Sequence, residues 1–206
     1  RSKYFIENMI ELKKLSIDKP YEIFKHKYNL SLKAKQNHIE AICISSYSKE
    51  LNEVSSRFVN LKMIYDKEFI FFSNYNSLKA SDFANHKQIT ALIFWDSINI
   101  QIRMKAFIKK TSRDFNANYF KKRNKKKNAL AISSFQSQQI ESYKDVKRNY
   151  LKILNTENLE ECPEFWGGFS FTPYYFEFWE GHKTRLNKRD VYENKNGQWI
   201  HSILQP

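Results

Sequence analysis

Apolar positions recur with two different periods along the chain. Over residues 1–35 the spacing is helical, and after the turn at Asp18 a stripe of Tyr21, Phe24 and Tyr28 follows. From residue 38 onward short apolar runs alternate with period two, which is typical of strands. These runs predict strands at 39–46, 56–64, 68–73, 89–95 and 98–108. One helix is expected among them at 77–85, with Ser77 as its N-cap.

The second half of the chain returns first to helical and then to strand spacing. Residues 112–155 favour helices, and the tail favours further strands, expected at 165–171, 174–179, 189–193 and 198–204. The Asn-Lys-Asn-Gly stretch at 194–197 predicts a hairpin turn. We therefore expect one α+β domain over 1–206. Its parts would be a helical arm (1–35), barrel strands (36–111), a helical segment (112–160) and C-terminal strands (161–206) that rejoin the first sheet.

Composition narrows the class of protein. The 206 residues are 41% hydrophobic and 16% aromatic, which is enough for a core and excludes intrinsic disorder. No apolar run approaches the roughly 18 residues that a membrane-spanning helix needs. No stretch near the start has signal-peptide character, so we expect a soluble, cytoplasmic protein without a membrane partner.

The charge is strongly basic, with 35 Lys and Arg against 22 Asp and Glu and a net charge of +13. Six of the positive charges fall within residues 121–127. Such a balance is compatible with nucleic acid, an anionic membrane or phosphorylated small molecules as partners. A run of this kind also occurs simply as a solvated surface, and composition does not choose among these alternatives.

Several common chemistries are excluded by their missing motifs. The five histidines show no paired ligand spacing, Cys43 and Cys162 read as free thiols, and no metal site is expected. There is no Gly-x-Ser-x-Gly elbow and no glycine-rich phosphate loop. A phosphate would therefore have to be bound by cations and hydroxyls. Arg57 and Lys62 bracket one strand, and Ser73 and Lys79 surround the start of the 77–85 helix.

Several runs around these candidate residues resemble those of a known family. The runs Arg57-Phe-Val-Asn-Leu-Lys62, Phe72-Ser-Asn with Ser77-Leu-Lys79, and Gln101 are similar to the flavin-binding half of the pyridoxine/pyridoxamine 5′-phosphate oxidases. The runs at 165–169, 177–179 and 185–189 resemble that family's closing motif. The matches keep the family's order and spacing over nearly the whole chain. The resemblance implies an FMN-binding split β-barrel, antiparallel and Greek-key-like with flanking helices, and a homodimer that holds FMN at its interface.

The resemblance also implies a role for individual side chains. The implied FMN ligands are Arg57, Lys62, Phe72, Ser73, Leu78, Lys79, Gln101, Gln136, Ser137, Trp179 and Arg189. The implied substrate ligands are Arg1, Tyr4, Lys62, Tyr119, Arg123, Lys127, Arg185 and Asn187, of which Arg185 and Asn187 stand at the catalytic positions. The implied reaction oxidises pyridoxamine or pyridoxine 5′-phosphate to pyridoxal 5′-phosphate and reduces O2 to H2O2. The flavin carries the redox chemistry and the protein orients the substrate.

Three positions depart from the family pattern. Leu78 replaces an Arg beside the phosphate-binding Lys, Lys127 replaces a Ser of the substrate-phosphate cluster, and Asn187 replaces a His. Asn187 cannot take up a proton as an imidazole does. An alternative therefore stays open, a split-barrel FMN oxidoreductase with another substrate or weakened activity. A remote alternative is a basic nucleic-acid-binding module, although the resemblance implies small-molecule partners and no nucleic acid.

Overall fold

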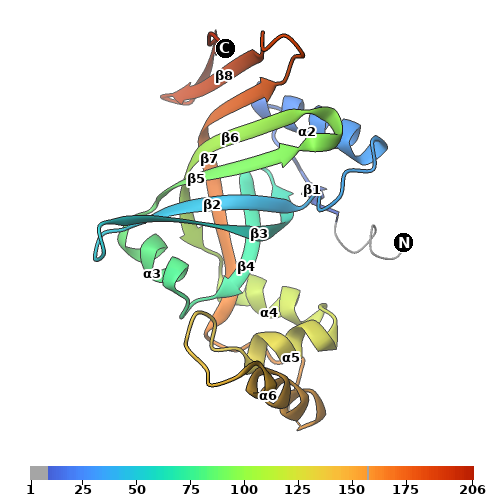
Figure 1. Ribbon diagram of the computed structural model, residues 1–206, viewed down its shortest axis with the longest axis vertical. Helices are drawn as coiled ribbons and strands as arrows, with labels where there is room; N and C mark the ends of the chain where they lie inside the picture. Colours follow the sequence, from blue (N-terminus) through green and yellow to red (C-terminus); the bar gives the residue numbers. More distant parts are fainter. Residues whose placement is uncertain (1–8, 157) are drawn as a thin grey trace.

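The computed structural model describes residues 9–156 and 158–206 as a β-barrel with helices at its ends (Figure 1). The predicted substrate residues Arg1 and Tyr4 lie outside the described residues. None of the helices in the described ranges is both long and apolar enough to cross a membrane. Cys43 and Cys162 are both free thiols, as the sequence predicts.

Six strands close the barrel. In chain order they are β2 (Ala41–Ser48), β3 (Glu53–Tyr65), β4 (Glu68–Asn74), β5 (Gln88–Trp95), β6 (Ile100–Lys110) and β7 (Trp166–Glu180). Antiparallel pairing runs β3-β2-β5-β6-β7, and β4 pairs with both β3 and β7 and so joins the two ends. The strands β8 (Lys188–Lys195) and β9 (Gln198–Ile203) extend the sheet beyond β7. The expected α+β barrel is confirmed.

Two expectations about the elements are wrong. Residues 1–35 are not helical throughout, because Glu11–Lys13 forms strand β1, which pairs parallel with β3, and the helix α2 begins only at Lys19 and ends at Lys33. The two strands expected at 165–171 and 174–179 are one continuous strand, β7. Pro173 lies opposite Ala106, directly beside a register shift between β6 and β7. Proline is tolerated at such irregularities, since they leave its missing N–H without a role in the ladder.

The tail hairpin forms as predicted. Asn196 and Gly197 both have positive φ, 53° and 89°, and connect β8 to β9. This is the geometry that favours Asn-Gly in a two-residue turn. The side-chain oxygen of Asn194 accepts a hydrogen bond from the Gly197 N–H at 3.0 Å.

Helix α2 covers one end of the barrel with its predicted aromatic stripe. Tyr21, Phe24 and Tyr28 are buried, and the Phe24 ring lies 5.2 Å from Phe69 and 5.7 Å from Trp95. The Tyr28 hydroxyl accepts from the Ile10 N–H at 2.8 Å and donates to the Ile10 carbonyl at 3.1 Å. Burial of these rings therefore fixes both the helix and the chain that precedes it.

The remaining helices stand near the other end of the barrel, around the site described below (Figure 1). They are α3 (Leu78–Asn85), α4 (Arg113–Lys121), α5 (Lys125–Ser133) and α6 (Tyr143–Thr156). A short 3₁₀ turn, η1 (Asp96–Ile98), instead contacts α2. The Ser112 hydroxyl caps α4 by accepting from the Phe115 N–H at 3.3 Å. The Asn124 side chain caps α5 by accepting from the Lys126 N–H at 2.9 Å.

Candidate active site

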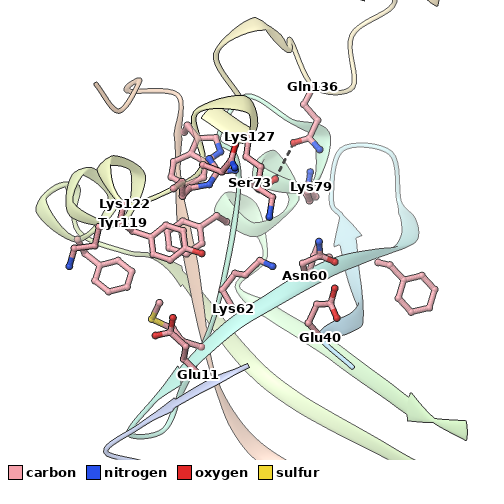
Figure 2. A pocket seen from close by; sticks show the side chains of 18 of the residues that line it. Glu11, Glu40, Asn60, Lys62, Ser73, Lys79, Tyr119, Lys122, Lys127 and Gln136 are labelled. Carbon is pink, nitrogen blue, oxygen red and sulfur yellow. Dashed lines mark hydrogen bonds between the residues drawn. The ribbon is translucent and has the colours of Figure 1, made fainter. Parts of the chain in front are cut away.

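A cavity of about 1320 Å³ lies between β3, β4, the start of α3, helices α4 and α5 and the segment after α5. Figure 2 shows the labelled side chains that line it, among them Glu11 from β1 and Glu40 from the residue before β2. The lining is strongly cationic, with two carboxylates, Glu11 and Glu40, against seven cations: Lys13, Arg57, Lys62, Lys79, Lys122, Arg123 and Lys127. Such an excess of positive charge around one space favours an anionic ligand.

One end of the cavity is formed by Arg57 and Lys79. Lys79 is only 8% exposed, and its Nζ donates to the Ser77 hydroxyl at 3.0 Å. Burial and the nearby Arg57 guanidinium lower the pKa of Lys79 from 10.5 to about 8. Burial also lowers the pKa of Arg57, whose Nη2 lies 3.8 Å from a carboxylate oxygen of Asp82. Two desolvated cations therefore lie close together with one carboxylate beside Arg57.

Ser77 precedes α3 as the sequence predicts, but its hydroxyl does not cap the helix. It donates to the Asn74 carbonyl at 2.8 Å and accepts from Lys79 instead. The first N–H groups of α3 consequently have no side-chain cap from Ser77. Free N–H groups at a helix start attract anions, which adds to the charge of Lys79.

The segment after α5 is tied to the end of β4. The Ser73 hydroxyl donates to Gln136 Oε1 at 3.1 Å, and the Asn74 side chain donates to the Ser134 carbonyl at 3.1 Å. Ser137 has a positive φ of 74°, which turns the chain at the cavity wall. The predicted residues Ser73, Gln136 and Ser137 are thereby brought together although more than sixty positions separate Ser73 from the other two.

A stack of near-parallel rings forms another wall. The Phe72 ring lies 3.8 Å from Tyr119, at 10°, and 5.0 Å from Trp166, at 7°. The Arg123 guanidinium lies 4.4 Å from the centre of the Trp166 ring. Burial lowers the pKa of Arg123, and its Nη1 is buried without a hydrogen-bond partner among the described residues. Helix α4 ends two residues before Arg123, so Tyr119 and Arg123 do not share one helix, but both side chains line the cavity.

Lys62 reaches the same space from β3. Burial lowers its pKa, the positive charges of Lys127 and Arg123 lower it further, and Glu40 opposes them. Lys62 therefore lies close enough to Lys127 and Arg123 for their positive charges to lower its pKa. Lys62, Arg123 and Lys127 therefore form a second set of cations in the cavity, beside the set of Arg57 and Lys79.

Five of the predicted site residues do not line the described cavity: Gln101, Trp179, Arg185, Asn187 and Arg189. Three of them form a row, since Gln101 pairs with Trp179 on β7 and Trp179 pairs with Arg189 on β8. The half-exposed Phe94, which pairs with Gln101, continues the row on β5. We call this set the outer row. A single chain therefore contains two groups of predicted residues that it does not itself bring together.

Glu177 holds Arg189 in place within this sheet face. Its carboxylate accepts from Arg189 Nε at 2.8 Å and is also paired with Arg103. Burial alone would raise the pKa of Glu177, but the hydrogen bonds from Arg103 and Arg189 lower it. Glu177 is 3% exposed, so this carboxylate keeps its charge through those two partners.

Arg185 and Asn187 belong to the loop between β7 and β8. Arg185 is exposed and has a positive φ of 63°. The side-chain oxygen of Asn187 accepts from the His182 N–H at 2.9 Å. Asn187 therefore closes its own loop through its carbonyl oxygen, and both of its amide hydrogens stay available to other partners.

Comparison with known proteins bears on this geometry. The model of the pyridoxine 5′-phosphate oxidase C-terminal dimerisation region matches residues 166–206. A pyridoxine/pyridoxamine 5′-phosphate oxidase from Aliarcobacter butzleri is 33% identical over 209 residues, covering 100% of this chain and 97% of the relative. The chain belongs to the pyridoxine/pyridoxamine 5′-phosphate oxidase family. A second oxidase of that name, from Leptospira biflexa, is 34% identical over 154 residues, 74% of this chain and 73% of its own.

Solved structures confirm the split-barrel fold. PhzG from Burkholderia lata 383, in complex with tetrahydrophenazine-1-carboxylic acid, superposes with a TM-score of 0.85 at 20% identity, covering 98% of this chain and 96% of its own. A pyridoxamine 5′-phosphate oxidase-related, FMN-binding protein from Nostoc punctiforme gives 0.73 at 11% identity, covering 93% and 100%. At these identities the likeness concerns the fold.

Some cavity residues are absent from the site predicted by resemblance to the oxidase family. Among them are Glu11, Glu40, Asn60, Phe115 and Trp166. Phe115 could have been found from its spacing, because it lies four residues before Tyr119 on one helix. Glu40 interrupts the apolar run that starts at Ile39. A carboxylate in such a run is unusual and therefore marks a candidate functional residue.

Proposed function

We propose that this chain is an FMN-dependent oxidase of phosphorylated B6 vitamers. It converts pyridoxamine 5′-phosphate, with water, to pyridoxal 5′-phosphate and ammonia, or pyridoxine 5′-phosphate to pyridoxal 5′-phosphate, and O2 becomes H2O2. The observation that carries the proposal is the pair of separate cation sets in one cavity, Arg57 with Lys79 and Lys62 with Arg123. A flavin phosphate and a substrate phosphate require one set each.

The first set fits the phosphate of FMN. Lys79 is desolvated enough to lower its pKa, and a phosphate dianion would restore the stability of its charged form. Ser73, Gln136 and Ser137 add a hydroxyl and further polar groups on the same side. Leu78 is 69% exposed and supplies no cation, so this site would rely on Arg57 and Lys79. When bound, FMN accepts a hydride from the substrate carbon and passes the electrons to O2.

The second set fits a phosphate on the substrate. Arg123 has a buried Nη1 that lacks a partner among the described residues, and its planar group is held against Trp166. A guanidinium fixed in this way can bind two phosphate oxygens at once. Tyr119 adds a hydroxyl and Lys127 a further charge on the same side of the cavity. These groups would anchor the substrate by its phosphate and leave its ring free to lie along the flavin.

A second copy of the chain would complete the site. The C-terminal dimerisation region includes β7 and β8, on which Trp179 and Arg189 lie. We infer that the outer row of one subunit, with Gln101, faces the cavity of the other and contacts the flavin. Arg185 would then reach the substrate from the partner's side. Asn187 would offer its amide hydrogens, since its oxygen closes the loop.

A substrate panel tests the activity. The FMN-loaded protein is mixed in air with pyridoxamine and pyridoxine 5′-phosphates and with the same vitamers without phosphate, and peroxide is followed. We expect peroxide only from the phosphorylated pair. Peroxide from none of these, but from an unphosphorylated compound of another class, would favour the alternative that Leu78 and Asn187 leave open, a split-barrel oxidoreductase with a different substrate.

A further inference from the structure

Glu40 is the one buried carboxylate that lines the described cavity. It is 4% exposed and directly precedes β2, and its carbonyl accepts a hydrogen bond from the Leu61 N–H at 2.8 Å. The backbone of Glu40 is therefore fixed beside Leu61 of β3. The next residue, Lys62, extends its side chain into the cavity. In Figure 2 the Glu40 carboxylate points toward the interior, near Asn60.

The Glu40 carboxylate is incompletely satisfied. Its Oε2 is buried and has no hydrogen-bond partner among the described residues. Its negative charge acts on Lys62, whose pKa it raises against the effects of burial, Lys127 and Arg123. A buried carboxylate oxygen without a hydrogen-bond partner is costly, and a ligand that donates a hydrogen bond to it would offset this cost.

The other carboxylate of the cavity behaves differently. Glu11 forms an ion pair with Lys13 at 2.6 Å, and its side chain is 56% exposed. Water and Lys13 therefore satisfy Glu11 without a ligand. Of the two carboxylates, Glu40 is the one left with an oxygen to offer.

A ligand that satisfies Glu40 must bring a hydrogen-bond donor. The two candidate substrates of the proposed function differ at this point, because one carries an amine, cationic near neutral pH, and the other a neutral hydroxyl. A hydrogen bond between two charged groups is about twice as strong as a neutral one. The surrounding cations would repel an ammonium group, and a carboxylate offsets this repulsion locally.

We propose that Glu40 is a specificity-determining residue whose carboxylate faces the substrate and favours the amine vitamer over the alcohol. This inference rests on the proposed function and goes beyond it, since it names which of the two substrates the site prefers. It assigns the preference to binding, so that it appears in the Michaelis constant more than in the turnover number.

The test compares wild type with Glu40→Gln, which removes the charge at nearly constant shape, and with Glu40→Asp, which keeps it. Steady-state kinetics are measured with pyridoxamine and pyridoxine 5′-phosphates on the holoenzyme. In Glu40→Gln we expect the KM for the amine to rise about tenfold and that for the alcohol to change less than about twofold. Glu40→Asp should keep most of the preference. Glu50→Gln, which removes an exposed charge outside the cavity, is the matched control and should leave both constants unchanged.

A binding measurement separates substrate contact from turnover. The holoenzyme is reduced chemically without oxygen, so that no hydride transfer can follow, and dissociation constants for the two vitamers are measured by calorimetry. The amine should lose about tenfold in affinity in Glu40→Gln and the alcohol much less.

Equal effects on both vitamers, or none on either, would overturn the assignment of Glu40. A loss of folded protein is detected by the thermal midpoint, and Glu40→Asp then supplies the comparison. If the wild-type holoenzyme oxidises neither vitamer, the proposed function fails, which is a different result from an unchanged preference.

Discussion

At the scale of single residues, the site is defined by cations held away from water. Lys79 is the clearest case, because burial and Arg57 lower its pKa to about 8, while its hydrogen bond goes to the neutral hydroxyl of Ser77. A phosphate that binds Lys79 interacts best with the protonated amine and so raises this pKa. Binding is therefore linked to proton uptake wherever free Lys79 is already deprotonated.

The first prediction is that the affinity for FMN falls as the pH rises above about 8. Below that pH Lys79 is charged in both the free and the bound protein, so its protonation does not oppose binding. Above it the free protein must take up one proton, which costs up to about tenfold in affinity per pH unit. Flavin fluorescence titrations at several pH values measure this. In Lys79→Met binding should be weaker and should lose this step, and an unchanged step in the variant would contradict the assignment.

A second prediction concerns the guanidinium of Arg123. Arg123→Lys keeps the charge but loses the flat group that stacks on Trp166 and can bind two oxygens. We expect the KM for the phosphorylated substrate to rise about tenfold, with FMN affinity nearly unchanged. The control is Lys121→Met, which removes an exposed charge from the same basic run outside the cavity. If Lys121→Met has the larger effect, the run acts through its general charge.

At the scale of elements, the site depends on how closely β7 approaches α4. A Cβ atom on Gly167 would overlap the Tyr75 hydroxyl and the Asn116 side chain. Those two groups form a hydrogen bond of 3.0 Å, and Asn116 also accepts from the Gly168 N–H at 2.9 Å. This junction fixes α4, and with it Tyr119, relative to the barrel.

The third prediction is that Gly167→Ala destabilises the protein by about 1–3 kcal/mol, because the added methyl must displace packed groups. Chemical denaturation measures the free energy of unfolding. Ser81→Ala is the control, since this side chain is exposed on α3 and lies outside the junction. We expect its free energy of unfolding to change by less than about 0.5 kcal/mol. A neutral Gly167→Ala would mean that the junction is not tightly packed.

Individual helices and strands can be predicted well from the sequence, whereas the pairing between strands is predicted less well. The strands of the barrel and the stripe Tyr21, Phe24 and Tyr28 follow from period and burial, which are local properties. The short strand β1 does not, because three residues carry no clear period and form a strand only by pairing with β3. The register shift that lets β7 run through Pro173 likewise depends on its partner, β6.

Prediction of the site has a similar limit. Eleven of the predicted residues line the cavity because the fold brings distant segments together, as with Ser73 and Gln136. A resemblance to a family finds only the positions that the family shares. Glu40 lies outside that pattern, and its importance depends on burial and on the missing partner of its oxygen, which a sequence alone does not contain.

At the scale of the whole molecule, the two groups of predicted residues argue for a dimer. The cavity holds the cations proposed to bind phosphate, whereas the outer row lies on the exposed sheet face and includes Phe94, which is 55% exposed. An exposed aromatic side chain in a row with predicted flavin ligands is typical of an interface. The matched dimerisation region contains two strands of this row.

The fourth prediction is that Phe94→Asp yields monomers that no longer bind FMN tightly, while the barrel remains folded. The new charge would be buried in the interface without a partner. Sedimentation gives the mass, flavin fluorescence the binding, and circular dichroism the fold. Leu151→Asp on α6, far from β8 in Figure 1, changes a similarly exposed apolar residue and should stay dimeric. Monomeric wild type that binds FMN normally would contradict the shared site.

The most direct test of the central claim uses the FMN-loaded protein mixed with pyridoxamine 5′-phosphate in the absence of oxygen. We predict that the visible absorbance of the flavin disappears in one turnover, that pyridoxal 5′-phosphate forms in equal amount, and that oxygen restores the absorbance with release of peroxide. In Arg185→Leu the flavin should remain bound but lose its absorbance far more slowly. A protein that takes up no FMN, or whose flavin absorbance is unchanged by either phosphorylated vitamer, would contradict the account.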